Sequence, residues 1–390
     1  MTRLFLLEPT YSPAWLPFAD SRPVSELRAG AWLIRERWEA IASAETEAIF
    51  GPAHLHSFSE AGVPPVRAQA AVDGPAFIGR SDFAPAGVAP EFDASASTRF
   101  THDSATVGWW VAEGDRWEGP SDAGDAVELD GIALRGAFDL VTALEHLLTA
   151  DCADFLTEGG ASVPDGVQVI GDADELVILD ALVEPGCTFD VRSGAVILEQ
   201  GAYITSGTRL QGPCYVGPGT IILGGSVANS ALGPQCRVRG EVSSSVFLGY
   251  ANKAHDGFVG HSVIGYWANL GAGTITSNLK NTYGNVRLSV GDTRIETERQ
   301  YLGSLIGDHV KTAIGTMLGT GTILGAGANV FGDRRPPKHV PAFAWGLDGA
   351  RQQLDGFLTV VERVMPRRKV EVDDAIRAML TALYRHAVGG

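Results

Sequence analysis

Aliphatic residues recur at every sixth position through much of the second half of this chain. The period is carried by Ile204, Leu210, Val216, Ile222, Ile264, Leu270, Ile306, Leu318, Leu324 and Val330. A period of six matches neither an α-helix nor the simple alternation of a strand. It is typical of the hexapeptide repeat of a parallel β-helix. Three hexads make one triangular coil of about 18 residues, in which the first aliphatic residue points inward.

The repeat divides the chain into three predicted regions. Residues 1–160 mix short apolar strands with amphipathic helices, which predicts an α/β domain. Residues 161–335 hold the repeat, and residues 336–390 combine a basic, proline-rich segment with a C-terminal helix. That helix has apolar residues at helical spacing, namely Ile376, Met379, Leu380 and Leu383. The period is lost over residues 278–301, and an insertion of this kind is extruded as a loop, often on the binding face.

Composition sets the broad class of the protein. The 390 residues are 45% hydrophobic and 19% charged, which is typical of a globular chain. The net charge of −16 argues against nucleic acid as a partner, because its phosphates would repel the chain. The four cysteines lack the spacing of zinc or redox motifs, which favours a reducing cytoplasm. We expect neither a signal peptide nor a membrane span, since no apolar run approaches about 20 residues.

A cluster of ionisable side chains interrupts the repeat in NKAHDGFVGHSVIG, residues 252–265. The hexad frame places Leu248 and Ala254 inward, so His255 is expected to point outward. Three interpretations are open: a solvated turn, a zinc site like that of the trimeric gamma-class carbonic anhydrases, and a general base for acyl transfer. The zinc site is weakened because His255 and His261 are six residues apart and no third ligand has a suitable spacing. The ordinary imidazole pKa of about 6.5 suits proton transfer from an amine at neutral pH.

Two neighbours complete this hypothetical catalytic cluster. Lys253 could bind an anionic group of a substrate, and Asp256 or a backbone carbonyl could hold the imidazole in one tautomer. In such a site the acceptor amine attacks a thioester while His255 takes its proton.

The longer segment NKAHDGFVGHSVIGYWANLGAGTITSN, residues 252–278, resembles the acetyltransferase half of a bifunctional family. This is the N-acetylglucosamine-1-phosphate uridyltransferase / glucosamine-1-phosphate acetyltransferase family. It has a Lys-Ala-(Gly)-His motif and, farther on, Asn-Ile-Gly-Ala-Gly-Thr-Ile-Thr-Cys-Asn, and the spacing from His255 to Gly271 is the same. The segments GYANKAHDGF and SNLKN resemble a divergent bacterial subgroup with a reduced N-terminal half. The resemblance implies a left-handed β-helix assembled as a homotrimer, with acetyl-CoA and an amino-sugar phosphate bound between subunits.

The resemblance also implies roles for single residues. His255 would be the general base, Asn278 would lie near the acyl-transfer centre, and the backbone of Ala272 would contact the thioester. Further implied contacts are those to the sugar phosphate, from Asn252, Lys253, Asp256 and Asn269, and those to acetyl-CoA, from Gly273, Arg334 and Arg335. The chain departs from the family at Phe258, where the family has a tyrosine, and near Ser244, where it has a phosphate-binding lysine.

The N-terminal region resembles this family more weakly. A sugar nucleotidyltransferase opens with a glycine-rich loop whose amides approach the nucleotide phosphates, but here no glycine precedes Gly30. Arg22 and Arg28 are the candidates for binding a nucleotide, and surface salt bridges are an equal alternative for both. Mg²⁺ is a possible cofactor of this region, but the sequence assigns it no carboxylate ligands, and Glu8 and Asp20 are only guesses.

The sequence therefore predicts a cytoplasmic transferase of cell-envelope biosynthesis. It would acetylate an amino-sugar phosphate, best glucosamine 1-phosphate, with acetyl-CoA. Coupled nucleotidyl transfer from UTP would yield UDP-N-acetylglucosamine, and neither nucleic acid nor a membrane is an expected partner. The alternatives are an acyltransferase with a non-catalytic N-terminal domain, a metalloenzyme resembling gamma-class carbonic anhydrase, and a structural solenoid without catalysis.

Overall fold

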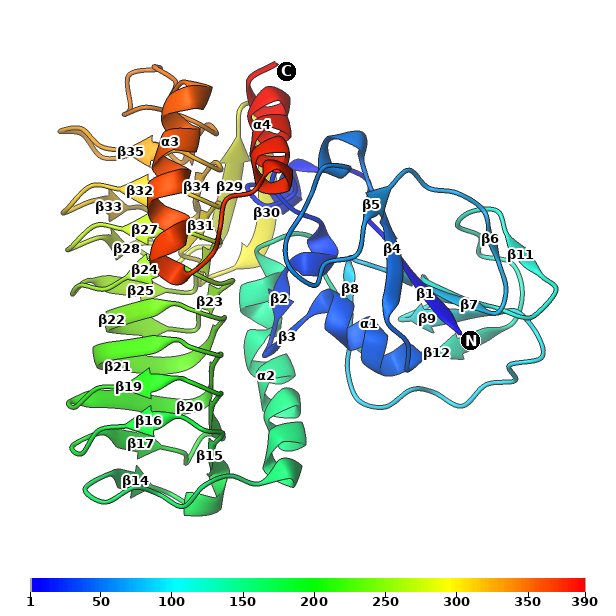
Figure 1. Ribbon diagram of the computed structural model, residues 1–390, viewed down its shortest axis with the longest axis horizontal. Coiled ribbons are helices and arrows are strands. Elements are labelled where there is room, and N and C mark those ends of the chain that lie inside the picture. The colour runs from blue at the N-terminus through cyan, green and yellow to red at the C-terminus, as the bar shows by residue number, and fades with distance from the viewer. Residues whose placement is uncertain (1, 390) are drawn as a thin grey trace.

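The computed structural model describes residues 2–389 as an α/β region that lies beside a long solenoid (Figure 1). The α/β region is built on a seven-stranded sheet of order β12-β9-β10-β7-β1-β4-β5. Its strands are β1 (Arg3–Leu7), β4 (Thr46–Phe50), β5 (Val66–Arg67), β7 (Ala76–Arg80), β9 (Thr98–His102), β10 (Ala105–Val111) and β12 (Ala126–Glu128). Strand β1 pairs in parallel with β4 and β7, whereas β10 runs antiparallel to β7. The predicted α/β class is confirmed.

Smaller elements complete the N-terminal region. They are β2 (Arg28–Ala29), β3 (Trp32–Leu33), α1 (Ile34–Ala42), β6 (Val72–Asp73), β8 (Phe83–Pro85), β11 (Arg116–Trp117) and β13 (Gly131–Ala133). Helix α1 packs on the sheet through Trp38, which is fully buried. A Cβ atom at Gly79 would lie 2.4 Å from the Trp38 ring, so the glycine gives the indole its place on the sheet.

From β14 onward the chain forms the solenoid, a left-handed parallel β-helix as predicted. Its lower strands are β14 (Gln168–Ile170), β15 (Leu176–Ile178), β16 (Leu182–Val183), β17 (Thr188–Asp190), β18 (Val196–Leu198), β19 (Tyr203–Ile204), β20 (Thr208–Val216), β21 (Ile221–Leu232), β22 (Arg237–Ser243) and β23 (Val246–Phe247). The upper strands are β24 (Asn252–Lys253), β25 (Phe258–Gly260), β26 (Val263–Ile264), β27 (Asn269–Leu270), β28 (Ile275–Thr276), β31 (Ser304–Ile306), β32 (Lys311–Thr312), β33 (Met317–Leu318), β34 (Thr322–Leu324), β35 (Asn329–Val330) and β36 (His339–Val340). All ten aliphatic residues that carry the six-residue period lie in its core.

One face of the solenoid has apolar side chains both toward its interior and on its outer surface. In β23, β26, β31 and β34 two adjacent apolar residues divide between the interior and the outside. Phe247 and Ile264 point into the core, whereas Val246 and Val263 belong to the cluster that continues into the N-terminal region. Helix α2 (Asp139–Glu158) packs on this face over β18, β20, β21 and β23, in the lower half of the solenoid (Figure 1). The two regions of the chain therefore share one hydrophobic core.

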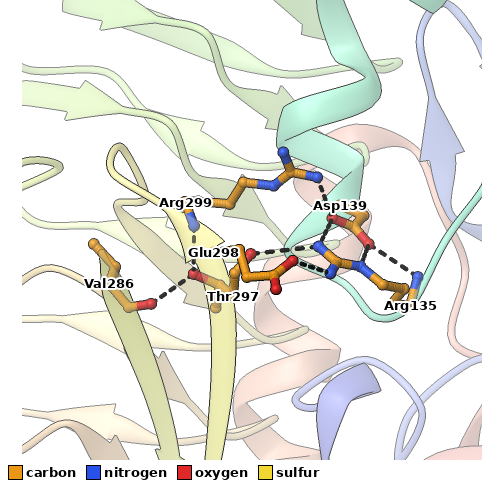
Figure 2. Close-up of polar contacts among 6 residues, drawn as sticks. All are labelled: Arg135, Asp139, Val286, Thr297, Glu298 and Arg299. Carbon is orange, nitrogen blue, oxygen red and sulfur yellow. Dashed lines mark hydrogen bonds and ion pairs between the residues drawn. The ribbon is translucent and has the colours of Figure 1, made fainter. Parts of the chain in front are cut away.

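The insertion at residues 278–301 is a hairpin that packs against the N-terminal region. Strands β29 (Val286–Val290) and β30 (Thr293–Arg299) pair antiparallel, and Val286 and Leu288 are fully buried in the shared core. Figure 2 shows Arg299 and Arg135 converging on Asp139 at the start of α2. The expected loop thus joins the two regions.

The C-terminal residues form two helices among those that the structure describes, α3 (Leu354–Val364) and α4 (Asp374–Gly389). The expected helix around Ile376 is α4, and α3 was not foreseen. Both pack with Trp267 and Phe343 in a separate cluster against the upper coils.

The parallel sheet continues through β36, so the solenoid extends beyond the predicted boundary at residue 335. Neither α3 nor α4, nor any other helix in residues 2–389, has the length and hydrophobicity to cross a bilayer.

Candidate functional site

His255 lies at a corner of the solenoid, in the turn that joins β24 to β25. Its side chain is exposed, as the outward orientation predicted. Asp256 beside it is also exposed and accepts a hydrogen bond from Nε of Arg239 over 3.1 Å. The imidazole is accessible from solvent, so a bound acceptor could reach it.

The same corner continues through the coils above His255. The amide of Gly273 donates to the carbonyl of Asp256 over 2.9 Å, and the amide of Gly315 donates to the carbonyl of Ala272 over 2.7 Å. These hydrogen bonds stack the turns directly on one another. The amide of Ala272 itself makes no hydrogen bond within the described residues. It is therefore a donor available to a ligand at this corner.

Arg334 and Arg335 lie at the upper end of this corner. Together with Ile314, Gly315 and Phe331 they line a hollow of about 210 Å³. Arg334 also pairs with Asp348 over 3.0 Å. Neighbouring coils are about 4.8 Å apart, so three steps carry the line from His255 to Arg334 over about 14 Å. The predicted base and the predicted acetyl-CoA contacts thus share one corner.

Lys253 needs a correction, because its side chain points into the solenoid. The residue is only 2% exposed and pairs in register with the core residue Val238. Its Nζ donates to the carbonyls of Arg239 over 2.8 Å and His255 over 2.6 Å. Burial lowers its pKa to about 8. Lys253 therefore braces the turn that carries His255 and does not face a substrate phosphate.

The expected frame was shifted by one residue at this point. Leu248 and Ala254 were placed inward, but the interior positions belong to Phe247 and Lys253. Leu248 is buried on the outer side, in the core shared with the N-terminal region. The outward direction of His255 holds because a tight turn follows Lys253 and reverses the alternation.

Asn252 and Asn269 lie one above the other on the face that precedes this corner. The amide nitrogen of Asn252 donates to Oδ1 of Asn269 over 2.7 Å. The strand register continues the column downward to Arg237 and upward to Lys311. Both predicted sugar-binding residues are half-buried and side by side.

Asn278 lies at the next corner of the coil, after β28. Its amide nitrogen donates to Nδ1 of His261 over 2.9 Å, and the His261 ring stacks on Tyr301 with centroids 5.2 Å apart. Burial lowers the pKa of His261, so this imidazole is held neutral with its proton on Nε2. Sequence reasoning assigned no role to His261 and did not single out Tyr301. The six-residue spacing of His255 and His261 suggested a pair of metal ligands, and it gave no sign of the contact between His261 and Asn278.

Phe258 bridges the two corners. A Cβ atom at Gly260 would lie 2.4 Å from Cζ of Phe258 and 2.8 Å from the amide nitrogen of Asn278. Glycine is therefore required beneath the two side chains. His255 and Asn278 flank one face of the coil, with the Phe258 ring on the surface between them. No group of three or more histidine, cysteine, aspartate or glutamate side chains suited to a metal occurs within residues 2–389.

The N-terminal arginines take structural positions. Arg22 is 2% exposed, and its guanidinium pairs with Glu60 and Asp308, each over 2.9 Å. It also lies over the Tyr266 ring, 4.0 Å from the centroid. Arg28 is buried and donates to the carbonyl of Ala31. Neither guanidinium is free to meet a nucleotide in this arrangement, which corrects the expected contacts.

Glu8 follows β1, at the sheet edge where parallel α/β sheets bind their ligands. Its carboxylate accepts the backbone amides of Val24 over 2.5 Å and Ser25 over 3.1 Å. Burial raises the pKa of Glu8. Asp20 accepts from the hydroxyl of Tyr11. These two carboxylates do not fit a Mg²⁺ site, because both oxygens of Glu8 accept backbone amides and Asp20 is engaged by Tyr11 and His386.

Comparison with known proteins gives matches to parts of this chain. Residues 5–78 match the family model described as sugar nucleotidyl transferase. A bifunctional sugar-1-phosphate nucleotidylyltransferase/acetyltransferase of Sulfurisphaera tokodaii is 36% identical over 150 residues, 35% of this chain and 35% of the relative. Bifunctional proteins GlmU of Methanococcus vannielii and Methanocaldococcus jannaschii are 32% and 30% identical, over 30% and 37% of this chain and 28% and 37% of the relatives.

The chain spans about a third of the length of the curated relatives it matches. These matches relate it, distantly, to the bifunctional sugar-1-phosphate nucleotidylyltransferase/acetyltransferases. They support a transferase as the class of enzyme.

Proposed function

We propose that this chain transfers the acetyl group of acetyl-CoA to the amine of an amino-sugar phosphate, with glucosamine 1-phosphate as the best candidate. The observation that carries the proposal is the single corner shared by His255, the amide of Ala272 and the hollow at Arg334. The distant bifunctional relatives support the same reaction class.

The proposed chemistry uses one general base. The amine nitrogen attacks the thioester carbonyl carbon while His255 accepts the proton that the nitrogen loses. The oxyanion of the tetrahedral intermediate accepts a hydrogen bond from the amide of Ala272. The carbon–sulfur bond then breaks, and the coenzyme A thiolate leaves and is protonated. Lys253 contributes by holding the carbonyl of His255 in place.

The proposed assembly is a homotrimer with sites between subunits. Its support is the apolar surface beside the corner, where Ile275, Ile314 and Met317 are 40%, 80% and 57% exposed. Strands β28 and β33 place Ile275 and Met317 next to each other. Apolar side chains grouped in this way mark interaction surfaces, and a second copy of the chain would bury them.

The substitution His255→Ala tests the catalytic role. We expect kcat for acetyl transfer to fall by about 10² to 10⁴, with the oligomeric state and the thermal unfolding unchanged because the side chain is exposed. The matched control is His146→Ala, which removes an exposed imidazole from α2. Acetyl transfer by His255→Ala at the wild-type rate would sink the assignment.

Nucleotidyl transfer from UTP by the N-terminal region is the second part of the proposal, and the matching sugar nucleotidyl transferase model supports it. The backbone amides of Val24 and Ser25 already donate to the Glu8 carboxylate and so are not free for a nucleotide phosphate. This favours a second candidate function, an acyltransferase whose N-terminal region does not catalyse. Pyrophosphate release, measured with each nucleoside triphosphate and N-acetylglucosamine 1-phosphate, separates the two. Acetyl transfer without any pyrophosphate release selects the second candidate.

A further inference from the structure

Cationic side chains gather where the end of α3 meets the solenoid. Arg367 and Arg368 belong to the 3₁₀ turn that follows the helix (Met365–Arg368). With Lys311 they line a cavity of about 240 Å³. Arg237 lies in register below Asn252, which also lines the cavity. Burial and the nearby Arg368 lower the pKa of Arg237. We call Arg237, Lys311, Arg367 and Arg368 the α3 cation cluster.

The α3 cation cluster has no carboxylate of its own. Within the described residues none of its four members forms an ion pair. Lys311 makes one long hydrogen bond, 3.3 Å to the carbonyl of His309, and Nε of Arg368 is buried without a partner. This is unexpected in a chain whose net charge is −16.

The cluster is electrostatically unfavourable as it stands. Burial lowers the pKa of Lys311 to about 8. The pKa of Arg237 is lowered by burial and by Arg368, and that of Arg368 by burial and by Arg367. Like charges brought together at partly buried positions favour the binding of an anion, which would reverse these effects.

The remaining lining of the cavity is neutral and suited to a polar substituent. Asn252 and Asn269 present side-chain amides. Tyr250 and Trp267 stack with centroids 4.4 Å apart and form an aromatic wall. A cavity of this volume is smaller than the roughly 300–1,000 Å³ of a drug-sized site, so it suits a small anion or one end of a larger ligand.

We propose that this cavity binds a phosphate monoester. The phosphate oxygens accept hydrogen bonds from Lys311, Arg367 and Arg368. The organic group of the ester lies against Asn252, Asn269 and the Trp267 ring. Arginine is suited to this task because its guanidinium binds phosphate through two parallel hydrogen bonds.

Two phosphate monoesters could supply this group, the amino-sugar phosphate and the 3′-phosphate of coenzyme A. The sugar is favoured, an assignment that rests on the proposed function. Asn252 precedes His255 by three residues, so their Cα atoms are at most about 10 Å apart. A sugar anchored by its phosphate in the cavity would extend along this face toward the imidazole. The cluster then takes over the role expected of Lys253.

The test compares binding to the wild-type chain and to a double variant, Arg367→Gln with Arg368→Gln. Isothermal titration calorimetry measures Kd for inorganic phosphate, glucosamine 1-phosphate and coenzyme A. We expect the double variant to bind glucosamine 1-phosphate at least about tenfold more weakly. Lys311→Met should act in the same direction. The control Arg363→Gln removes one exposed charge of α3 and should leave Kd unchanged, and thermal unfolding verifies that each variant is folded.

The outcomes separate this inference from the proposed function. Unchanged affinity for all three probes in the folded double variant would overturn the phosphate site, and loss of acetyl transfer in His255→Ala would still support the proposed reaction. Weaker binding of coenzyme A alone would keep the site and overturn its assignment to the sugar. Phosphate binding that depends on the two arginines, in a chain that acetylates no amino-sugar phosphate, would support the site and refute the proposed reaction.

Discussion

A lysine occupies an interior position of this solenoid where the coils below and above have Val238 and Leu270. It is tolerated because Nζ of Lys253 donates to two backbone carbonyls at the corner, where the interior meets the turn. The sequence pattern could not reveal this position. A long side chain with an apolar stem can fill an interior site and still direct its ammonium to main-chain oxygens. The expected hexad frame, which placed Leu248 and Ala254 inward, is therefore off by one residue here.

The buried ammonium predicts a pH dependence of stability. Lys253 has a folded pKa of about 8, below the ordinary lysine value of about 10.4. Between these values the unfolded chain binds more protons, so the free energy of unfolding rises with pH in this window. Below pH 8 both states are charged and the cost of burying the charge is fully present. We expect the free energy of unfolding of the wild type, relative to Lys253→Met, to increase from pH 8 to pH 10 in urea titrations. A flat difference would contradict the lowered pKa.

The hairpin of β29 and β30 shows how one element joins two regions. Asp139 is buried at the first turn of α2, where the helix dipole favours a carboxylate, and it accepts from Arg135 and Arg299 (Figure 2). Glu298 pairs with Arg135 over 2.8 Å but is 72% exposed. Asp139 and Glu298 therefore contribute differently to the free energy of unfolding, although both pair with Arg135.

This contrast gives a matched pair of substitutions. We expect Asp139→Ala to lower the free energy of unfolding by about 1.5–3 kcal/mol, because buried hydrogen bonds to a charged group are lost. Glu298→Ala should change it by less than about 1 kcal/mol, since exposed ion pairs contribute little. Urea denaturation followed by circular dichroism measures both. Equal effects would show that burial does not govern this junction.

At this scale the fold was largely predictable and the packing of the elements was not. The period of six fixed the solenoid, because only one residue in six needs to be aliphatic and inward. The doublets Val246–Phe247 and Val263–Ile264 carried a further signal that was not used. Two adjacent apolar residues in a short strand indicate a face buried on both sides. They mark the face that packs against the N-terminal region, whereas the position of α3 and its arginines depends on a tertiary contact that no local pattern records.

For the whole molecule, Arg22 links the N-terminal region to the solenoid. Its partner Asp308 is 5% exposed and also accepts from the hydroxyl of Ser21 and the amide of Tyr266. The sequence left a nucleotide and a salt bridge as equal alternatives for Arg22, because the arginine lies roughly where sugar nucleotidyltransferases have a Pro-Lys pair. The acceptor that it meets lies 286 residues away in the chain, which no local motif could indicate.

Breaking this pair should weaken the whole molecule. We expect Arg22→Met to lower the free energy of unfolding by about 3–5 kcal/mol, because it leaves Asp308 charged, buried and without its cation. Combining it with Asp308→Asn should cost less than the sum of the two single variants, in a double-mutant cycle measured by urea denaturation. Additive effects would mean that the two side chains act independently.

The shared core beneath α2 has a consequence for the order in which the molecule is made. A ribosome releases Asp139–Glu158 before any strand of the solenoid, and domains emerge and fold from the N-terminus onward. The coils that contain β18, β20, β21 and β23 can then add their apolar outer faces to a helix that is already present. We infer that the helix serves as a template for these coils, which are added in the order of synthesis.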